Sequence, residues 1–386
     1  MKIVLAALTV ILLQASPVRA QNWKSYNELG DLYPSYAIAL ANLVQDDEKD
    51  DTHLGDANGI MGIVFTPTKA NTRIRLEIRC DNSFKLFETT VLDVVAPKAG
   101  VEYVITPLVP FNQLKLASVG QSVTTYITYK LTINDKPQPP RTERLRVRSI
   151  NDCPFAFQDD DGEETSIDFM FAAYVNEDHP YIQQILQEAL QKHYIDSFSG
   201  YQGEPTDVYR QVMAIWRVLQ ERGIRYSSIT MVAPTSDNVA SQHVRLLDES
   251  VRYTQANCAD GTVMLASILR KIDINPVLVV VPGHMFIGFD LDSEGKNQAY
   301  LETTMLGVDA RNTEIARQKL YQTLLGSNAD TKAQVAVRSF VAALESGNST
   351  FAESKNKIKR EKEGYAVVDI GAVREAGIAP IMYVGK

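Results

Sequence analysis

The sequence predicts an α+β protein in two parts, because its pattern changes along the 386 residues. Between residues 59 and 150, short runs rich in Val, Ile, Thr and Tyr alternate with Gly, Pro and Asn, as in an antiparallel sandwich. After residue 165, apolar residues recur at helical spacing, and helices precede strands that are neighbours in sequence. We therefore expect a β-rich, sandwich-like domain at 21–157, an acidic linker at 158–164 and an α+β domain at 165–386.

The composition excludes several classes of protein. The chain is 45% hydrophobic and 22% charged, which is ordinary for a globular protein and excludes global disorder, a collagen-like repeat and a disulfide-knotted miniprotein. It has 39 basic and 47 acidic residues, a net charge of −8 and a pI of about 5.3. Proteins that mainly hold nucleic acid or an anionic membrane carry a basic surplus, so we expect neither as a partner.

The first twenty residues have the pattern of a secretory signal peptide. Lys2 supplies the positive charge, Ile3–Leu13 is almost wholly apolar, and Val18-Arg19-Ala20 places small side chains at the −3 and −1 positions. Eleven residues are too few to cross a hydrocarbon core about 30 Å thick, and no later segment has 18 uninterrupted apolar residues. We expect cleavage before Gln21, export to the periplasm or beyond, and no membrane span in the mature chain.

In the first part, a helix is expected at 35–43 and strands at 62–65, 72–80, 84–95, 101–106 and 123–133. The run from Arg73 to Cys80 alternates strictly between polar and apolar residues. Its apolar members should therefore face the core together; they are Ile74, Leu76, Ile78 and Cys80.

In the second part, two amphipathic stripes predict helices near residues 182–190 and 208–219. Pro205 at the start of the second stripe and Gly223 after its end fit the usual asymmetry of helix termini. The pattern then predicts helices at 258–271, 313–325 and 331–344, and strands at 276–281, 284–291, 298–303 and 365–370.

The three cysteines, Cys80, Cys153 and Cys258, form an odd set for an oxidising compartment, so at most one internal pair can form. A Cys80–Cys153 disulfide is one option, because Cys153 follows the last strand of the same part; the Cα separation is not fixed by the sequence. A disulfide from Cys258 to either is another, and it would block any nucleophilic chemistry there.

Cys258 lies at the start of a predicted helix. Asn257 is a good N-cap, and Asp260 three residues later completes a capping box. In the first turn, free N–H groups and the positive helix end favour the thiolate over the thiol. The helix is apolar over most of its girth, which predicts burial between layers. Cys258 is thus a candidate nucleophile; the alternative is a small buried apolar side chain.

Of the five histidines, only His284 lies in an otherwise apolar strand. Turn-forming residues at 292–297 predict a hairpin, and folding it about Ser293 places His284 opposite Glu302, with Cβ atoms about 5 Å apart. Cys258, His284 and Glu302 would then suit the roles of nucleophile, base and orienting carboxylate. The cysteine at a helix start and the paired strands make this set more specific than a chance one.

This order of residues is similar to that of the transglutaminase-like superfamily, distant relatives of papain-type peptidases. The segments that carry the resemblance are Asn257–Gly261, Ile272–Pro276, Pro282–Phe286 and Leu301–Thr304. The resemblance covers Thr206 to Gly307, about a quarter of the chain. It implies a transglutaminase-like (papain-like) fold for the second part.

By the same resemblance, Cys258 would be the nucleophile, His284 the general base and Glu302 the residue that orients the imidazole. Three positions depart from the family pattern. Ala256 and Asp273 stand where the family often has glycine, and Glu302 stands where it usually has aspartate.

An oxyanion hole requires donors aimed at the developing charge. The Cys258 backbone N–H is one candidate, and a side-chain amide upstream would be the other. We favour Gln242 over Gln255, because Gln255 lies next to the N-cap; an ordinary surface role is the alternative for both. Metal-binding, P-loop and dinucleotide motifs are absent from the sequence, so we expect no metal and no cofactor.

These features predict an exported thiol hydrolase that cleaves a peptide or amide bond of a peptide or protein substrate through a Cys258 thioester. One alternative is a non-catalytic binding or assembly module that retains the fold, which the β-rich first part favours. Another is a cross-linking transglutaminase, in which an amine rather than water accepts the acyl group.

Overall fold

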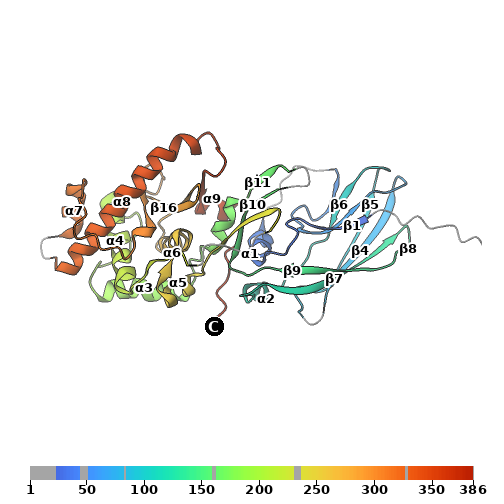
Figure 1. Ribbon diagram of the computed structural model, residues 1–386, viewed down its shortest axis with the longest axis horizontal. Coiled ribbons are helices and arrows are strands. Elements are labelled where there is room, and N and C mark those ends of the chain that lie inside the picture. The colour runs from blue at the N-terminus through green and yellow to red at the C-terminus, as the bar shows by residue number, and fades with distance from the viewer. Residues whose placement is uncertain are drawn as a thin grey trace, which may run out of the picture.

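A computed structural model describes residues 23–43, 51–81, 84–158, 162–229, 236–326 and 329–385. The expected signal peptide lies outside these residues. The molecule is elongated, with a β-rich part at one end and a helical part at the other (Figure 1). Helices and several sheets are both present, so the predicted α+β class is confirmed.

The β-rich part contains two sheets. The first has the order β1 (Trp23–Asn27), β3 (Met61–Phe65), β6 (Tyr103–Thr106) and β2 (His53–Gly55). The second has the order β5 (Thr90–Ala96), β4 (Thr72–Cys80), β7 (Val123–Ile133) and β8 (Lys136–Pro137), and β9 (Arg141–Val147) pairs with β7. Two short helices, α1 (Pro34–Ala39) and α2 (Gln113–Ala117), accompany them. Buried residues of both sheets share one apolar core.

Strand β4 shows why the alternating pattern was informative. Ile74, Leu76, Ile78 and Cys80 are buried, and the arginines between them are exposed. The strand predicted at 84–95 is wrong in its first half, because β5 begins only at Thr90. Lys85 has a left-handed backbone (φ 42°), which ends extended geometry at that point, and Phe87 forms only an isolated bridge to Phe111.

A three-stranded sheet lies between the two parts. Its central strand β10 (Asp152–Gln158) pairs antiparallel with β11 (Glu164–Ser166) on one side and with β13 (Val239–His243) on the other. The segment 158–164, of which residues 159–161 are not described, therefore connects two strands of one sheet. The boundary expected there runs through a sheet that the first and second parts share.

The helical part is built around a four-stranded antiparallel sheet. Its order is β17 (Gln298–Leu301), β16 (His284–Asp290), β15 (Pro276–Val281) and β18 (Ala366–Asp369). Short strands β12 (Arg225–Tyr226) and β14 (Gln255–Ala256) pair with each other. The helices are α3 (Pro180–Gln191), α4 (Pro205–Glu221), α5 (Leu247–Tyr253), α6 (Cys258–Lys271), α7 (Gln318–Leu325), α8 (Thr331–Ile358) and α9 (Ile370–Glu375), with 3₁₀ segments η2 (Asp168–Tyr174) and η3 (Thr303–Met305).

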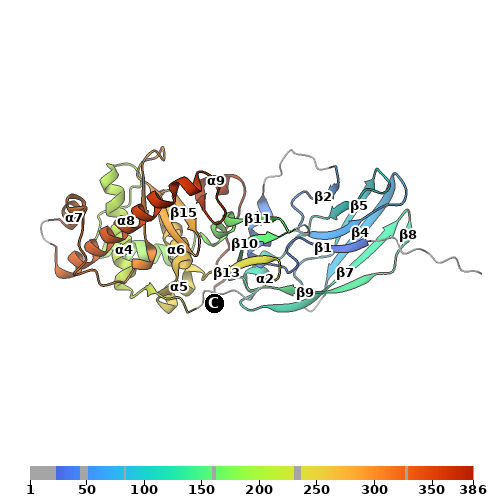
Figure 2. The ribbon, with the colours of Figure 1, turned by 45° about the horizontal axis from the view of Figure 1, so that its top comes forward.

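Two predicted helices differ in length from the observed ones. Helix α8 was expected to end near residue 344, but it continues as one long helix to Ile358 (Figure 2). Small residues such as Gly347 let its second half pack closely along β17. Helix α7 begins at Gln318 rather than at residue 313. Helix α8 also packs against α4, where the indole of Trp216 is fully buried and donates a hydrogen bond to Ser339 (3.2 Å).

The C-terminal residues tie the two parts together. The backbone N–H of Ala379 donates to Ala39 of α1, and that of Ile381 donates to Ala173 of η2. The Asn176 side chain in turn donates to the Ile381 carbonyl (2.9 Å). Among the described residues, no helix has the length and apolar character needed to cross a bilayer.

Candidate active site

The N-terminus of α6 has the local structure that its sequence predicts. The Asn257 side chain accepts a hydrogen bond from the Asp260 N–H, and the Asp260 carboxylate accepts one from the Asn257 N–H, both at 2.9 Å. Cys258 is the first residue of the helix and is 5% exposed. Its carbonyl accepts hydrogen bonds from the hydroxyls of Thr262 and Thr303. The capping box thus fixes the cysteine at the helix mouth.

His284, at the start of β16, is in direct contact with Glu302. The His284 Nε2 and Glu302 Oε2 atoms are 2.7 Å apart. The other carboxylate oxygen accepts hydrogen bonds from the backbone N–H (3.0 Å) and the hydroxyl (2.7 Å) of Thr304. Glu302 is therefore held on both oxygens, and its side chain is 9% exposed. The structure brings together the two residues that the hairpin argument paired.

The register of that hairpin is different from the predicted one. Ile287 lies opposite Leu301, so continuing the ladder sets Glu302 against Phe286 rather than against His284. The pairing is thus shifted by two residues, and the centre of the turn by one. A two-residue shift keeps side chains on the same face, and the long glutamate side chain reaches the diagonal neighbour. An aspartate at this place would have a shorter reach.

The electrostatics of His284 follow from its two partners. Hydrogen bonding with Cys258 and with Glu302 raises the pKa of the imidazole to about 10, although burial opposes the shift. Burial acts to raise the pKa of Glu302, but hydrogen bonds from His284 and Thr304 outweigh it and hold that pKa below its ordinary value. At neutral pH the site therefore holds an imidazolium between a sulfur and a carboxylate. The His284 ring also lies over Phe286, with centroids 6.0 Å apart.

Cys258 and His284 open into one cavity of about 570 Å³. This volume is within the usual range for a small-ligand site. Gln242 of β13 also lines the cavity, whereas Gln255 lies on β14 and is not among its lining residues. The structure thus brings only one of the two candidate amides to the thiol. A second cavity, about 640 Å³ between α4 and α8, contains no Cys or His among its lining residues.

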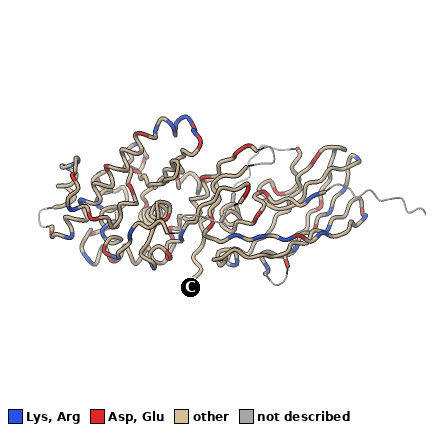
Figure 3. Tube along the Cα trace, viewed as in Figure 1, with Lys and Arg blue, Asp and Glu red and all other residues tan. Residues whose placement is uncertain are grey.

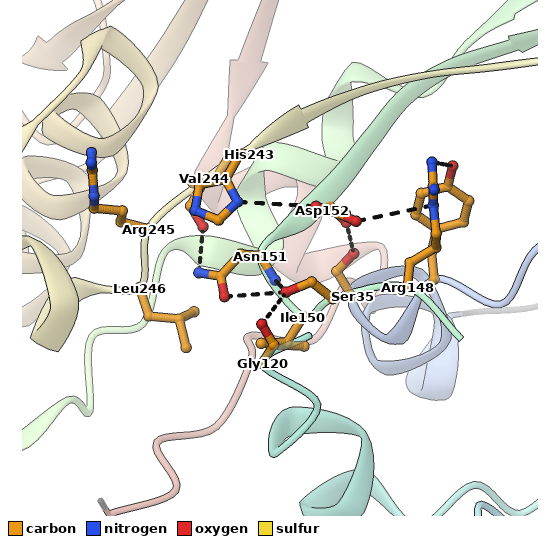
Figure 4. Close-up of polar contacts among 12 residues, drawn as sticks. Ser35, Gly120, Arg148, Ile150, Asn151, Asp152, His243, Val244, Arg245 and Leu246 are labelled. Carbon is orange, nitrogen blue, oxygen red and sulfur yellow. Dashed lines mark hydrogen bonds and ion pairs between the residues drawn. The ribbon is translucent and has the colours of Figure 1, made fainter. Parts of the chain in front are cut away.

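Strand β13 is anchored on both sides of Gln242. Gln242 pairs with Cys153 on β10, and the ring of the next residue, His243, points toward Asp152 (Nδ1 to Oδ1, 4.0 Å; Figure 4). Asn151 donates a side-chain hydrogen bond to the Val244 carbonyl (2.9 Å). These contacts fix the strand that carries the amide against the shared sheet.

All three cysteines are free, so neither disulfide option is present. Cys153 is fully buried, and its sulfur contacts the Pro154 carbonyl (3.7 Å). Cys80 is buried beside the Thr125 hydroxyl (3.6 Å). Within the described parts of the chain, no group of three or more His, Cys, Asp or Glu residues is arranged to hold a metal ion.

Some contacts of the site were missed from the sequence. Thr304 holds Glu302, and Thr262 and Thr303 hold the Cys258 carbonyl. The side chain of Glu302 caps the 3₁₀ turn that follows it, and a carboxylate two residues before a threonine is a local signal that would have found Thr304. Thr262 lies four residues after Cys258 in the same helix, the spacing at which a threonine hydroxyl bonds the carbonyl one turn back, so this contact also had a local signal.

Comparison of the chain with protein-family models, with curated proteins and with solved structures gave no match.

Proposed function

We propose that this chain is an exported thiol hydrolase of the transglutaminase-like fold that cleaves a peptide or amide bond. The observation that carries the proposal is the position of His284, which is hydrogen-bonded to Glu302 at 2.7 Å and has its pKa raised to about 10 by Cys258 and Glu302. A cysteine at a helix mouth, a histidine beside it and a carboxylate behind the histidine are the parts of an activated nucleophile.

In the proposed reaction, the Cys258 proton resides on His284, and the thiolate attacks the substrate carbonyl carbon. The Cys258 N–H and the Gln242 side-chain amide donate hydrogen bonds to the oxyanion that forms. His284 then gives its proton to the leaving amine, and the C–N bond breaks to leave a thioester on Cys258. Water, deprotonated by His284, attacks the thioester and releases the carboxylic acid product.

Two features support the fold assignment. The buried helix α6 is followed by the antiparallel strands β15, β16 and β17; Cys258 begins α6, His284 begins β16, and Glu302 directly follows β17. Asp273, in the turn after α6, has a left-handed backbone with φ 58°. That conformation favours glycine, which is the residue the resembling family often has at this position. Export is supported by the pattern of residues 1–20.

The proposal is tested by alkylating the mature protein with iodoacetamide over a pH series and following Cys258 by mass spectrometry. Rapid labelling well below about pH 8, lost in His284→Ala, is expected for a thiolate–imidazolium pair. His193→Asn is the matched control, because His193 is exposed and its left-handed backbone suits asparagine. Labelling that follows an ordinary thiol near about pH 8.5 in all three proteins would instead favour a non-catalytic binding module.

A further inference from the structure

The cavity that holds Cys258 is lined by more acidic than basic side chains. Four carboxylates are among its lining residues, and no lysine or arginine is. They come from three separate elements: Glu164 from β11, Asp168 from η2, and Glu361 and Glu363 from the segment after α8. The remaining walls are largely apolar and include Phe155, Phe171, Val280, Val281, Pro282 and Met285.

The four carboxylates have no ion-pair partner among the described residues, and His284, the positive group of the cavity, is already paired with Glu302. Of the ion pairs between described residues, none involves any of the four. The Asp168 carboxylate accepts a hydrogen bond from the Ser166 hydroxyl (2.6 Å), but burial still raises its pKa. By contrast, the carboxylate of Glu188 on α3 pairs with both Lys192 and Arg222, each at 2.7 Å. Glu164, Glu361 and Glu363 are exposed and Asp168 is half-buried, so a cation that enters the cavity would meet a negatively charged, solvent-accessible lining.

The basic residues nearest in sequence do not supply that cation. The end of α8 and the residues after it carry several lysines (Figure 3). Lys357 and Lys362 lie over the ring of Tyr365, with Nζ atoms 4.9 and 6.0 Å from its centroid, and Lys357 also donates to the Tyr365 hydroxyl. Neither lysine lines the cavity, and Lys355, Lys359 and Arg360 do not line it either. The segment thus contributes its two glutamates to the cavity and not its cations.

The arrangement suits an organic cation. The described residues provide no group of three acidic or His/Cys side chains placed to bind a metal ion, so the carboxylates are spread around the cavity instead of converging on one point. Apolar walls contact the methylene groups of a long side chain, and the carboxylates meet its charged end. We propose that the cavity binds a peptide segment with a Lys or Arg side chain close to the scissile bond. This inference rests on the proposed hydrolase function of the same site.

The charge preference is measurable without the natural substrate. Cys258 is modified with three methanethiosulfonate reagents that carry an aminoethyl cation, a neutral methyl group or a sulfonatoethyl anion. Each rate is divided by the rate for 2-mercaptoethanol, which removes the intrinsic reactivity of the reagent. We expect the cation-to-anion ratio to be about tenfold or more at low salt and to fall as salt is added.

Paired variants identify the source of the preference. Glu361→Gln combined with Glu363→Gln should lower the ratio by about threefold or more, because two of the four carboxylates are neutralised. Glu353→Gln, an exposed glutamate on α8 that does not line the cavity, is the matched control and should leave the ratio unchanged. A normalised ratio near one in the unmodified protein, or an equal fall in the control, would overturn the inference.

The two proposals fail in different ways. Slow modification of Cys258 by all three reagents, as for an ordinary thiol, contradicts the proposed hydrolase function. The ratio still reports the charge of the cavity in that case, since it is independent of the absolute rate. Acylation by 4-nitrophenyl esters of acetyl-lysine, acetyl-norleucine and acetyl-glutamate gives a second readout. The expected order of kcat/KM is lysine, norleucine, glutamate, and the reverse order would contradict a cation preference.

Discussion

Arg245 and Asp260 form a buried ion pair that joins the strand of Gln242 to the helix of Cys258. The Arg245 backbone N–H and its Nη1 each donate to a different oxygen of Asp260, both at 2.7 Å. Asp260 has no exposed surface, and one of its oxygens also accepts the Asn257 N–H of the capping box. One carboxylate therefore sets the first turn of α6 against the end of β13, and with it the separation of the two proposed oxyanion donors.

Replacing Arg245 should be costly. Arg245→Met leaves the Asp260 carboxylate buried without its cation, and we expect a loss of about 3–5 kcal/mol in the free energy of unfolding. Urea unfolding measures the loss. The control is Arg210→Met, because Arg210 and Asp207 form an exposed pair of a kind worth less than about 1 kcal/mol. Equal stability of the two variants would show that the buried pair contributes no more than a surface one.

The features that the sequence predicted well are local. Strands β4 and β7 have the predicted bounds, and the N-terminus of α6 follows from Asn257 and Asp260, because alternation and capping involve residues close in the chain. Cys258, His284 and Glu302 could also be predicted, since they lie within 45 residues of one another at the starts of α6 and β16 and directly after β17.

The features that could not be predicted depend on contacts distant in sequence. The sequence does not distinguish a buried arginine such as Arg245 from an exposed one, and its contact with Asp260 forms only in the folded chain. Glu361 and Glu363 lie almost eighty residues beyond His284 and reach its cavity because β18 pairs with β15. The length of α8 was underestimated for a similar reason, because its second half is polar and its contact with β17 depends on small residues.

The stability of the protein should depend on the charge of His284. Its pKa rises from 6.5 to about 10 on folding, so the folded state holds the proton more tightly than the unfolded chain. The resulting stabilisation is fully present below about pH 6.5 and is lost as the pH rises through about 10. The difference in unfolding free energy between the unmodified protein and His284→Ala should therefore shrink from pH 7 to pH 10. A difference that is constant or grows over this range would contradict the raised pKa.

Removing the charge of Glu302 should lower the pKa of His284. Glu302→Gln keeps the length of the side chain but loses the negative charge that helps to raise the pKa of His284. We expect that pKa to fall by about one unit or more, and the rate of Cys258 alkylation at neutral pH to fall about tenfold. An NMR titration of the His284 ring gives the first quantity and mass spectrometry the second. An unchanged pKa of His284 would place its origin in Cys258 alone.

The three free thiols should differ in accessibility. Cys80 and Cys153 are buried in the β-rich part and the shared sheet, and burial raises the pKa of the Cys153 thiol well above its ordinary value. Cys258 opens into the cavity. Ellman's reagent should therefore modify one thiol in the native protein and three after unfolding without reductant. Only one thiol in the unfolded protein would indicate that a disulfide had formed.

Gly347 should be essential for placing Glu302, because α8 meets β17 there backbone to backbone. A methyl group at Gly347 would lie 2.6 Å from the Leu301 nitrogen and the Tyr300 carbonyl, which cannot move aside as a flexible side chain could. Close by, the Glu302 N–H donates to the Ala343 carbonyl (3.0 Å).

Gly347→Ala should therefore destabilise the protein by about 1–3 kcal/mol, although alanine is the better helix former by about 1 kcal/mol. It should also slow Cys258 alkylation, since a displaced β17 moves the carboxylate that holds His284. Ser349→Ala, two residues along α8 and exposed, should leave both quantities almost unchanged. If Gly347→Ala matched this control in urea unfolding and in alkylation rate, the close contact between α8 and β17 would not be what holds Glu302 in position.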